Sequence, residues 1–126
     1  MIYGIGTDIV RISRLARDLE RFGERFAERI LTEAELAEFR ASPKPAHFLA
    51  RRFAAKEAAA KAFGTGFANG LALRHIGVGH DEQGKPKLVF AERALELLRE
   101  RGIRIAHVSL ADEEDHAVAF VTFETG

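Results

Sequence analysis

The fold of this chain is decided by residues 52–66, which read RFAAKEAAAKAFGTG. The stretch is rich in alanine, lysine and glutamate, which are good helix formers, and it contains no proline. Gly64 stands where a helix commonly ends with a residue at positive φ. We therefore predict a long helix from about residue 46 to Phe63, followed by a glycine loop.

The charge placement in this helix is unusual. Glu57 and Lys61 lie four positions apart, so they share one helical face, and their neighbours are small alanines that permit close approach. A Glu–Lys pair at this spacing is commonly a surface ion pair that contributes roughly 0.3 kcal/mol. The remainder of the chain has to distinguish that interpretation from a chemical role.

Length and composition restrict the class of protein. The chain has 126 residues, and we predict one domain over residues 1–126. Its 19 basic and 19 acidic residues cancel, which argues against a nucleic-acid binder that relies on general positive charge. The absence of cysteine excludes a disulfide framework, a thiolate metal site and a cysteine nucleophile. With no secretory signal pattern and no apolar segment of membrane-spanning length, we expect a cytoplasmic protein without a membrane partner.

The first segment, residues 2–10, alternates like a β-strand. Gly4, Gly6 and Asp8 fall on one face, and the larger Tyr3 and Ile5 fall on the other. Two glycines on one face allow another backbone or a ligand to approach closely, and they bring Asp8 to that surface. A twisted edge strand that ends in a turn aspartate explains the same pattern without a function.

The next segment has helical periodicity over about residues 12–30, with a break at Gly23. One apolar stripe is expected to pack on the core: Leu15, Leu19, Phe22, Phe26 and Ile30. A second, basic stripe lies beside it: Arg11, Arg14, Arg17, Arg21 and Arg25. In a chain without net charge this stripe indicates an acidic partner, because arginine matches carboxylates and phosphates. A merely solvated face is the alternative interpretation.

The remaining segments complete an α+β pattern. Thr32 and Glu35 have the spacing of a capping box, so a short helix should begin near Glu33 and stop before the proline-containing residues 42–45. Further elements are predicted as strands at residues 76–80 and 86–90 around a turn, a helix ended by Gly102, and strands at 104–111 and 117–123. We predict an α+β fold in which a mainly antiparallel sheet packs against the long central helix.

Several chemistries lack support. The glycine loop follows its helix, whereas a nucleotide P-loop precedes one; the histidines have no zinc-like spacing; and no serine has a nucleophile-elbow motif. The carboxylates of Asp8 and Glu57 remain, and such a sparse ligand set suits Mg²⁺, which keeps several waters and also binds substrate phosphates. Lys61 would neutralise one phosphate, and amides of the glycine loop would bind another. This combination indicates group transfer from a diphosphate.

Four segments, taken together in this order and spacing, resemble the holo-[acyl-carrier-protein] synthases, the bacterial branch of the 4′-phosphopantetheinyl transferases. The segments are residues 4–10, 52–66, 84–86 and 107–112. One departure is His75, where many members of the family have an acidic residue. The resemblance implies the phosphopantetheinyl transferase fold and Mg²⁺-dependent transfer of 4′-phosphopantetheine from coenzyme A to a serine of apo acyl carrier protein. Adenosine 3′,5′-bisphosphate is the implied second product, and fatty acid biosynthesis the implied pathway.

The same resemblance implies roles for individual residues. Asp8 and Glu57 would ligate the metal, and Lys61 would stabilise charge on the phosphate or assist proton transfer. The diphosphate site would be lined by Gly64, Thr65 and Gly66. Arg52 and His107 would contact the nucleotide end of coenzyme A.

The resemblance also implies a homotrimer with active sites at subunit boundaries, so that His107 reaches the site of a neighbour. Because acyl carrier proteins are acidic around the modified serine, we expect a docking surface formed by Arg14, Arg17, Arg21 and Arg25. Two other functions stay open from the residues alone. One is a non-catalytic oligomeric module that binds acidic proteins through the arginines, and the other is a Mg²⁺-dependent diphosphate hydrolase.

Overall fold

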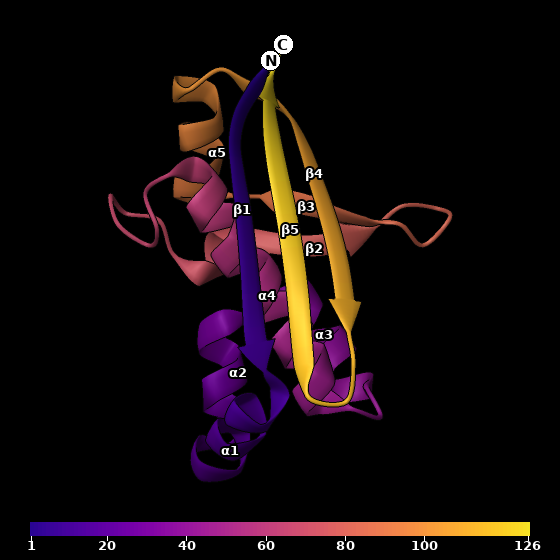
Figure 1. Cartoon of the computed structure of the whole chain (residues 1–126). Helices are drawn as coiled ribbons and strands as arrows, with labels where there is room; N and C mark the ends of the chain where they lie inside the picture. The colour runs from indigo at the N-terminus through magenta and orange to yellow at the C-terminus, as the bar shows by residue number, and fades with distance from the viewer.

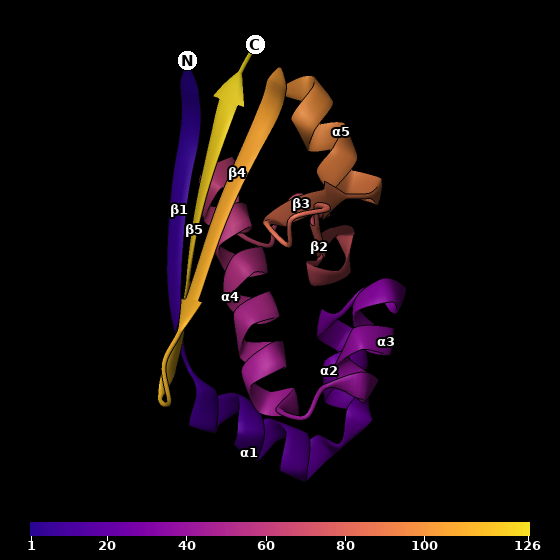
Figure 2. The ribbon, with the colours of Figure 1, turned by 90° about the vertical axis from the view of Figure 1, so that its right-hand side faces the viewer.

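A long helix, α4 (Pro45–Phe63), forms the middle layer of the computed structural model, which describes residues 1–126 (Figure 1 and Figure 2). Pro45 occupies the first helical turn, where its missing N–H costs no hydrogen bond. The helix ends at Gly64, which has a φ of 84° in the left-handed region. The helix predicted from about residue 46 to Phe63 is therefore confirmed.

Two sheets flank this helix rather than the single sheet that the sequence suggested. The inner face of a three-stranded antiparallel sheet lies on α4, and its order is β1 (Ile2–Arg11), β5 (His116–Thr125), β4 (Ile103–Asp112). A separate hairpin of β2 (Ile76–His80) and β3 (Pro86–Phe90) lies on the other side of α4, near α3 (Figure 2). Both strand pairs predicted from the sequence are present, and the fold is α+β.

Short helices close the ends of this layered arrangement. They are α1 (Ile12–Phe22), α2 (Glu24–Ile30), α3 (Glu33–Ala41), the 3₁₀ turn η1 (Leu73–His75) and α5 (Glu92–Glu100). The capping box predicted before α3 is present, because the Thr32 hydroxyl accepts from the Glu35 amide at 3.2 Å and the Glu35 carboxylate accepts from the Thr32 amide at 3.0 Å. No helix is long and apolar enough to span a bilayer.

Strand β1 and helix α4 touch backbone to backbone. A Cβ added to Gly6 would lie 1.8 Å from the carbonyl oxygen of Ala58, and one added to Gly4 would lie 2.0 Å from that of Ala62. The close approach predicted from the two glycines is confirmed, although β1 is also an edge strand of its sheet. Asp8, two residues beyond Gly6 on the same face, is thereby brought to α4.

The outer face of the three-stranded sheet carries exposed apolar side chains. Ile5, Ile9, Ile105 and Phe120 are 64%, 65%, 45% and 53% exposed. Figure 2 shows no helix or strand of the chain over this face. A row of large apolar groups in water is typical of a surface that another protein covers.

Helices α1 and α2 correct one expectation. The chain bends at Gly23, which has a φ of 68°, so the two helices do not share one continuous face. Leu15 and Ile30 of the predicted apolar stripe are buried, but Phe22, beside the bend, is 52% exposed. The basic stripe is interrupted in the same way: Arg11 ends β1 and Arg25 belongs to α2.

Candidate active site

Asp8, Glu57 and Lys61 meet where β1 crosses α4. The Lys61 ammonium donates to Asp8 Oδ1 at 3.0 Å and to the carbonyl oxygen of Thr7 at 2.9 Å. These three residues are the ones the sequence singled out as catalytic, and the fold brings them together across 53 positions of chain. Lys61 pairs with Asp8 across the two elements, so it is not simply the surface partner of Glu57 that the four-residue spacing allowed.

The electrostatics of this group favour a bound cation. Burial raises the pKa of Glu57, and the negative charge of Asp8 raises it further, while Lys61 and Arg14 act in the opposite direction. A carboxyl group whose ionisation is disfavoured by burial and by a neighbouring carboxylate forms a site that a divalent cation stabilises. No three or more histidine, cysteine or acidic side chains are arranged so that they could hold a metal ion together, so any metal here would take its other ligands from water or substrate.

The glycine loop after α4 differs from the phosphate cradle that was expected. The amide of Gly64 donates to the Lys61 carbonyl at 3.0 Å, and the amide of Gly66 donates to the Ala60 carbonyl at 3.2 Å. Both amides therefore satisfy the carboxyl end of α4, where the helix dipole is negative and disfavours a phosphate. The positive φ angles of Gly64 and Gly66, 84° and 59°, explain the choice of glycine. Thr65 uses its hydroxyl within the loop, donating to the Gly66 carbonyl at 2.8 Å.

Arg52 has a different environment from the one predicted. Its side chain is 5% exposed, and its guanidinium donates to the Val78 carbonyl at 3.1 Å and to Glu38 Oε2 at 3.1 Å. It also lies 3.5 Å from Glu35 Oε2 and stacks over the Phe48 ring at 4.3 Å. These contacts occupy the guanidinium inside the protein, which is the physical reason that this chain alone does not present Arg52 to a nucleotide.

His107 lies away from the carboxylate pair. It is on β4 and points to the outer face of the sheet, where its Nε2 lies 2.5 Å from Glu124 Oε2. A hollow beside His107 is lined by Lys85, Lys87 and Ser109, with one carboxylate, Asp81, among its other residues. The two lysines were not assigned from the sequence, although Lys85 belongs to one of the quoted motifs, and they make the hollow suitable for an anionic group.

The predicted docking arginines divide into two groups. Arg14, Arg17 and Arg21 line a shallow hollow on α1, together with the acidic Asp18 and Glu20. Arg25 follows the bend at Gly23 and does not line this hollow. Arg14 also stacks over Phe53 of α4 at 5.8 Å and is close enough to affect the pKa of Glu57, so the basic surface extends to the carboxylate pair.

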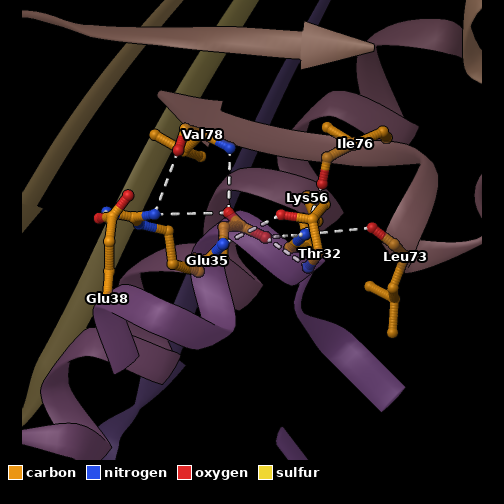
Figure 3. Close-up of polar contacts among 8 residues, drawn as sticks. Thr32, Glu35, Glu38, Lys56, Leu73, Ile76 and Val78 are labelled. Atoms are coloured by element: carbon orange, nitrogen blue, oxygen red, sulfur yellow. Dashed lines mark hydrogen bonds and ion pairs between the residues drawn. The ribbon is translucent and has the colours of Figure 1, made fainter. Parts of the chain in front are cut away.

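One buried polar group was missed from the sequence. Lys56 of α4 and Glu35 of α3 are 0% and 1% exposed and form an ion pair at 2.7 Å between the two helices (Figure 3). Charged residues in an alanine-rich helix are normally expected at the surface, so the sequence pattern did not predict that Lys56 is buried. His75, the departure from the family pattern, accepts the Ala72 amide at Nδ1 (3.1 Å) and so caps η1.

Comparisons with known proteins identify the family of this chain. Residues 4–121 match the family described as the 4′-phosphopantetheinyl transferase superfamily. The chain is 59% identical over 122 residues to the holo-[acyl-carrier-protein] synthase of Nitrosococcus oceani, a match that covers 97% of this chain and 79% of that protein. The crystal structure of the Neisseria meningitidis holo-[acyl-carrier-protein] synthase superposes with a TM-score of 0.94 at 50% identity, covering 99% and 100% of the two chains.

A third match is a holo-(acyl-carrier-protein) synthase from Bacillus anthracis, solved in complex with coenzyme A (3′,5′-ADP). It has a TM-score of 0.84 and 36% identity, and the match covers 100% of this chain and 99% of that one. The chain belongs to the 4′-phosphopantetheinyl transferase superfamily. Within that superfamily it groups with the holo-[acyl-carrier-protein] synthases, and it is an enzyme, which removes the non-catalytic binding module as an alternative.

Proposed function

We propose that this enzyme transfers the 4′-phosphopantetheine group of coenzyme A to a serine of an apo acyl carrier protein. The observation that carries the proposal is the meeting of Asp8, Glu57 and Lys61 in a chain 59% identical to a holo-[acyl-carrier-protein] synthase. The serine oxygen forms a bond to the phosphorus that bears pantetheine. The bond from that phosphorus to the bridging diphosphate oxygen breaks, adenosine 3′,5′-bisphosphate leaves with this oxygen, and the serine proton goes to solvent.

Asp8 and Glu57 are the residues that would hold Mg²⁺. The raised pKa of Glu57 beside Asp8 is the observation in favour, because a divalent cation relieves the repulsion that raises it. When bound, Mg²⁺ would neutralise the diphosphate charge as a Lewis acid.

Lys61 would stabilise the negative charge of the reacting phosphate. Its side chain is 52% exposed, so its ammonium is free to turn from Asp8 towards a substrate. Thr65 and the loop glycines Gly64 and Gly66 would line the diphosphate site. They would contribute the shape of the loop, because the amides of both glycines already donate to carbonyls of α4.

A homotrimer would complete the site. The exposed apolar face formed by Ile5, Ile9, Ile105 and Phe120 is the surface that a neighbouring subunit would cover. His107 lies on the same face, in the hollow with Lys85 and Lys87, and would there contact the nucleotide end of coenzyme A bound at the neighbour. Light scattering tests the assembly: Phe120→Glu is expected to shift the protein from trimer to monomer.

The carrier protein would dock on α1. Arg14, Arg17 and Arg21 form its basic surface, and Arg14 connects that surface with the carboxylate pair. Electrostatic steering by these arginines would bring the acidic partner to the reacting serine. With coenzyme A and a carrier protein as substrates, we place the reaction in the cytoplasm, in fatty acid biosynthesis.

The test is incubation with coenzyme A, Mg²⁺ and apo carrier protein, followed by mass spectrometry of the carrier. We expect the added phosphopantetheine arm with wild-type enzyme and none with Asp8→Ala or Glu57→Ala, although both variants stay folded. Wild-type turnover in either variant would refute the metal-ligand assignment. Release of free phosphopantetheine without a carrier protein would instead identify a diphosphate hydrolase.

A further inference from the structure

A buried network of hydrogen bonds around Lys56 and Glu35 connects one face of α4 to neighbouring elements. The Lys56 ammonium donates to Glu35 Oε1 at 2.7 Å, to the Leu73 carbonyl at 3.2 Å and to the Ile76 carbonyl (Figure 3). All three donors of the ammonium therefore have partners, which come from α3, η1 and β2. The other oxygen of Glu35 accepts the Val78 amide at 2.9 Å, which fixes the carboxylate against β2 as well.

Burying the charges of Lys56 and Glu35 costs solvation free energy, which their mutual attraction has to offset. Burial raises the pKa of Glu35, but Lys56 and the amides of Thr32 and Val78 more than offset this and hold it below its usual value. Burial also lowers the pKa of Lys56, and Glu35 offsets this only in part. Well-packed apolar residues commonly stabilise a protein as much as a buried ion pair does. A buried ion pair can instead act by favouring one arrangement of the helices and strands that it connects.

Helix α4 needs an interaction that fixes its orientation, because much of its buried surface carries only small side chains. Its buried faces consist largely of alanines that are 0–2% exposed: Ala54, Ala55, Ala58, Ala59, Ala60 and Ala62. Methyl groups form shallow ridges, so outside the close contact with Gly4 and Gly6 this part of the helix has few large side chains that would distinguish neighbouring rotations about its axis. Side chains with directional hydrogen bonds distinguish these rotations, as polar residues do in coiled coils.

The network and the proposed catalytic residues lie on opposite faces of this helix. At 100° per residue, the direction of Arg52 and Lys56 differs from that of Glu57 and Lys61 by roughly 140°. Fixing the face towards α3 and β2 therefore fixes the face towards Asp8. A carboxylate lies about 6 Å from the helix axis, so a rotation of about 10° moves it by about 1 Å.

We propose that Lys56, held by Glu35 and by the carbonyls of Leu73 and Ile76, is a positioning residue that sets the rotation of α4 and so directs Glu57 and Lys61 towards Asp8. The inference rests on the proposed transferase function. Lys56 contacts no substrate and acts through Glu57 and Lys61. A displacement of about 1 Å at a reacting group lowers rates by about 100-fold, so losing this restraint affects kcat more than substrate binding.

The experiment compares Lys56→Met with wild type. Glu35 keeps Arg52 and two amides as partners in this variant, so the capping box is retained. At a temperature where circular dichroism shows the variant folded, we expect kcat to fall about 10- to 100-fold. Calorimetric titration with Mg²⁺ alone should show weaker binding. The KM for carrier protein should not change, because α1 is untouched.

A second variant and a control separate positioning from stability. Glu35→Gln keeps the shape of the pair and removes its charge, and it should reproduce the loss of kcat and Mg²⁺ affinity to a smaller degree. Arg40→Met removes an exposed ion pair of the same helix α3, 2.5 Å from Glu24, and should leave both quantities unchanged. A lower melting temperature with wild-type kcat and Mg²⁺ affinity in both network variants would overturn the proposal. Absence of transfer by the wild-type enzyme would refute the proposed function, and the inference with it.

Discussion

Replacing Gly6 by alanine tests the contact between β1 and α4 directly. The new Cβ would lie 1.8 Å from the Ala58 carbonyl oxygen and 2.8 Å from the Ala62 amide nitrogen. Both are backbone atoms of a helix interior, so no flexible side chain can move aside. To bring the nearest contact from 1.8 Å to an ordinary 3.4 Å, strand and helix must separate by about 1.6 Å.

Separating β1 from α4 lowers the free energy of unfolding. Overpacking of this kind costs about 3 kcal/mol, the upper end of its usual range. With an unfolding entropy of about 2.1 cal/mol/K per residue, the 126 residues give roughly 0.26 kcal/mol/K. The expected decrease in Tm is therefore about 11 °C. Because Asp8 moves with the strand, Mg²⁺ affinity should fall in the protein that stays folded.

The assay is thermal denaturation at a fixed protein concentration, followed by Mg²⁺ calorimetry below the transition. Gly79→Ala is the matched control: its Cβ would lie 3.5 Å from a Val89 methyl group, an ordinary contact, in a strand without a positive φ. We expect this variant to melt within about 2 °C of wild type. If Gly6→Ala also melted like wild type, the backbone contact would not hold strand and helix together as described.

Three further predictions concern the site. Arg17→Glu combined with Arg21→Glu should raise the KM for carrier protein at least about 10-fold and leave the KM for coenzyme A unchanged; an unchanged carrier KM would refute docking on α1. His107→Ala should raise the KM for coenzyme A about 10-fold with little change in kcat, as expected for loss of a binding contact, and a selective loss of kcat would contradict this role. Because the folded-state pKa of Glu57 is raised, its contribution to stability is present at low pH and is lost as the pH rises through that pKa. Glu57→Gln stays neutral, so in metal-free protein it should raise the Tm at about pH 8 and not at about pH 4; an equal effect at both would contradict the electrostatic cause.

Local patterns predicted most of the fold. The strand alternation at residues 2–10, the Thr32 and Glu35 capping box, and the hairpin around residues 81–84 all rest on interactions between near neighbours in sequence. Two expectations failed. The hairpin of β2 and β3 forms a sheet of its own, and Phe22, whose spacing matches the apolar stripe, is exposed at the end of α1, just before the predicted break at Gly23.

The partners of charged residues were less predictable. Arg52 and Lys56 are bound by β2 carbonyls of Val78 and Ile76 that lie more than 15 positions away in sequence, and no local pattern encodes such contacts. The glycine loop shows a related limit, because composition reveals flexible residues but not which carbonyls their amides satisfy. The carboxylate pair was identified because both members occur in recognisable motifs, whereas the pairing of Lys61 with Asp8 required the fold.

The position of β1 in the sheet has a consequence for folding. Its sole neighbour in the sheet is β5, so Ile9 pairs with Val118 and Asp8 with Ala119 across more than a hundred residues. Contacts of such high sequence separation close late, because the entropy of the long loop is lost before any contact compensates for it. During synthesis, the sheet that supports Asp8 is therefore complete only after β5 has been made, and a nascent chain without β5 should have a lower metal affinity.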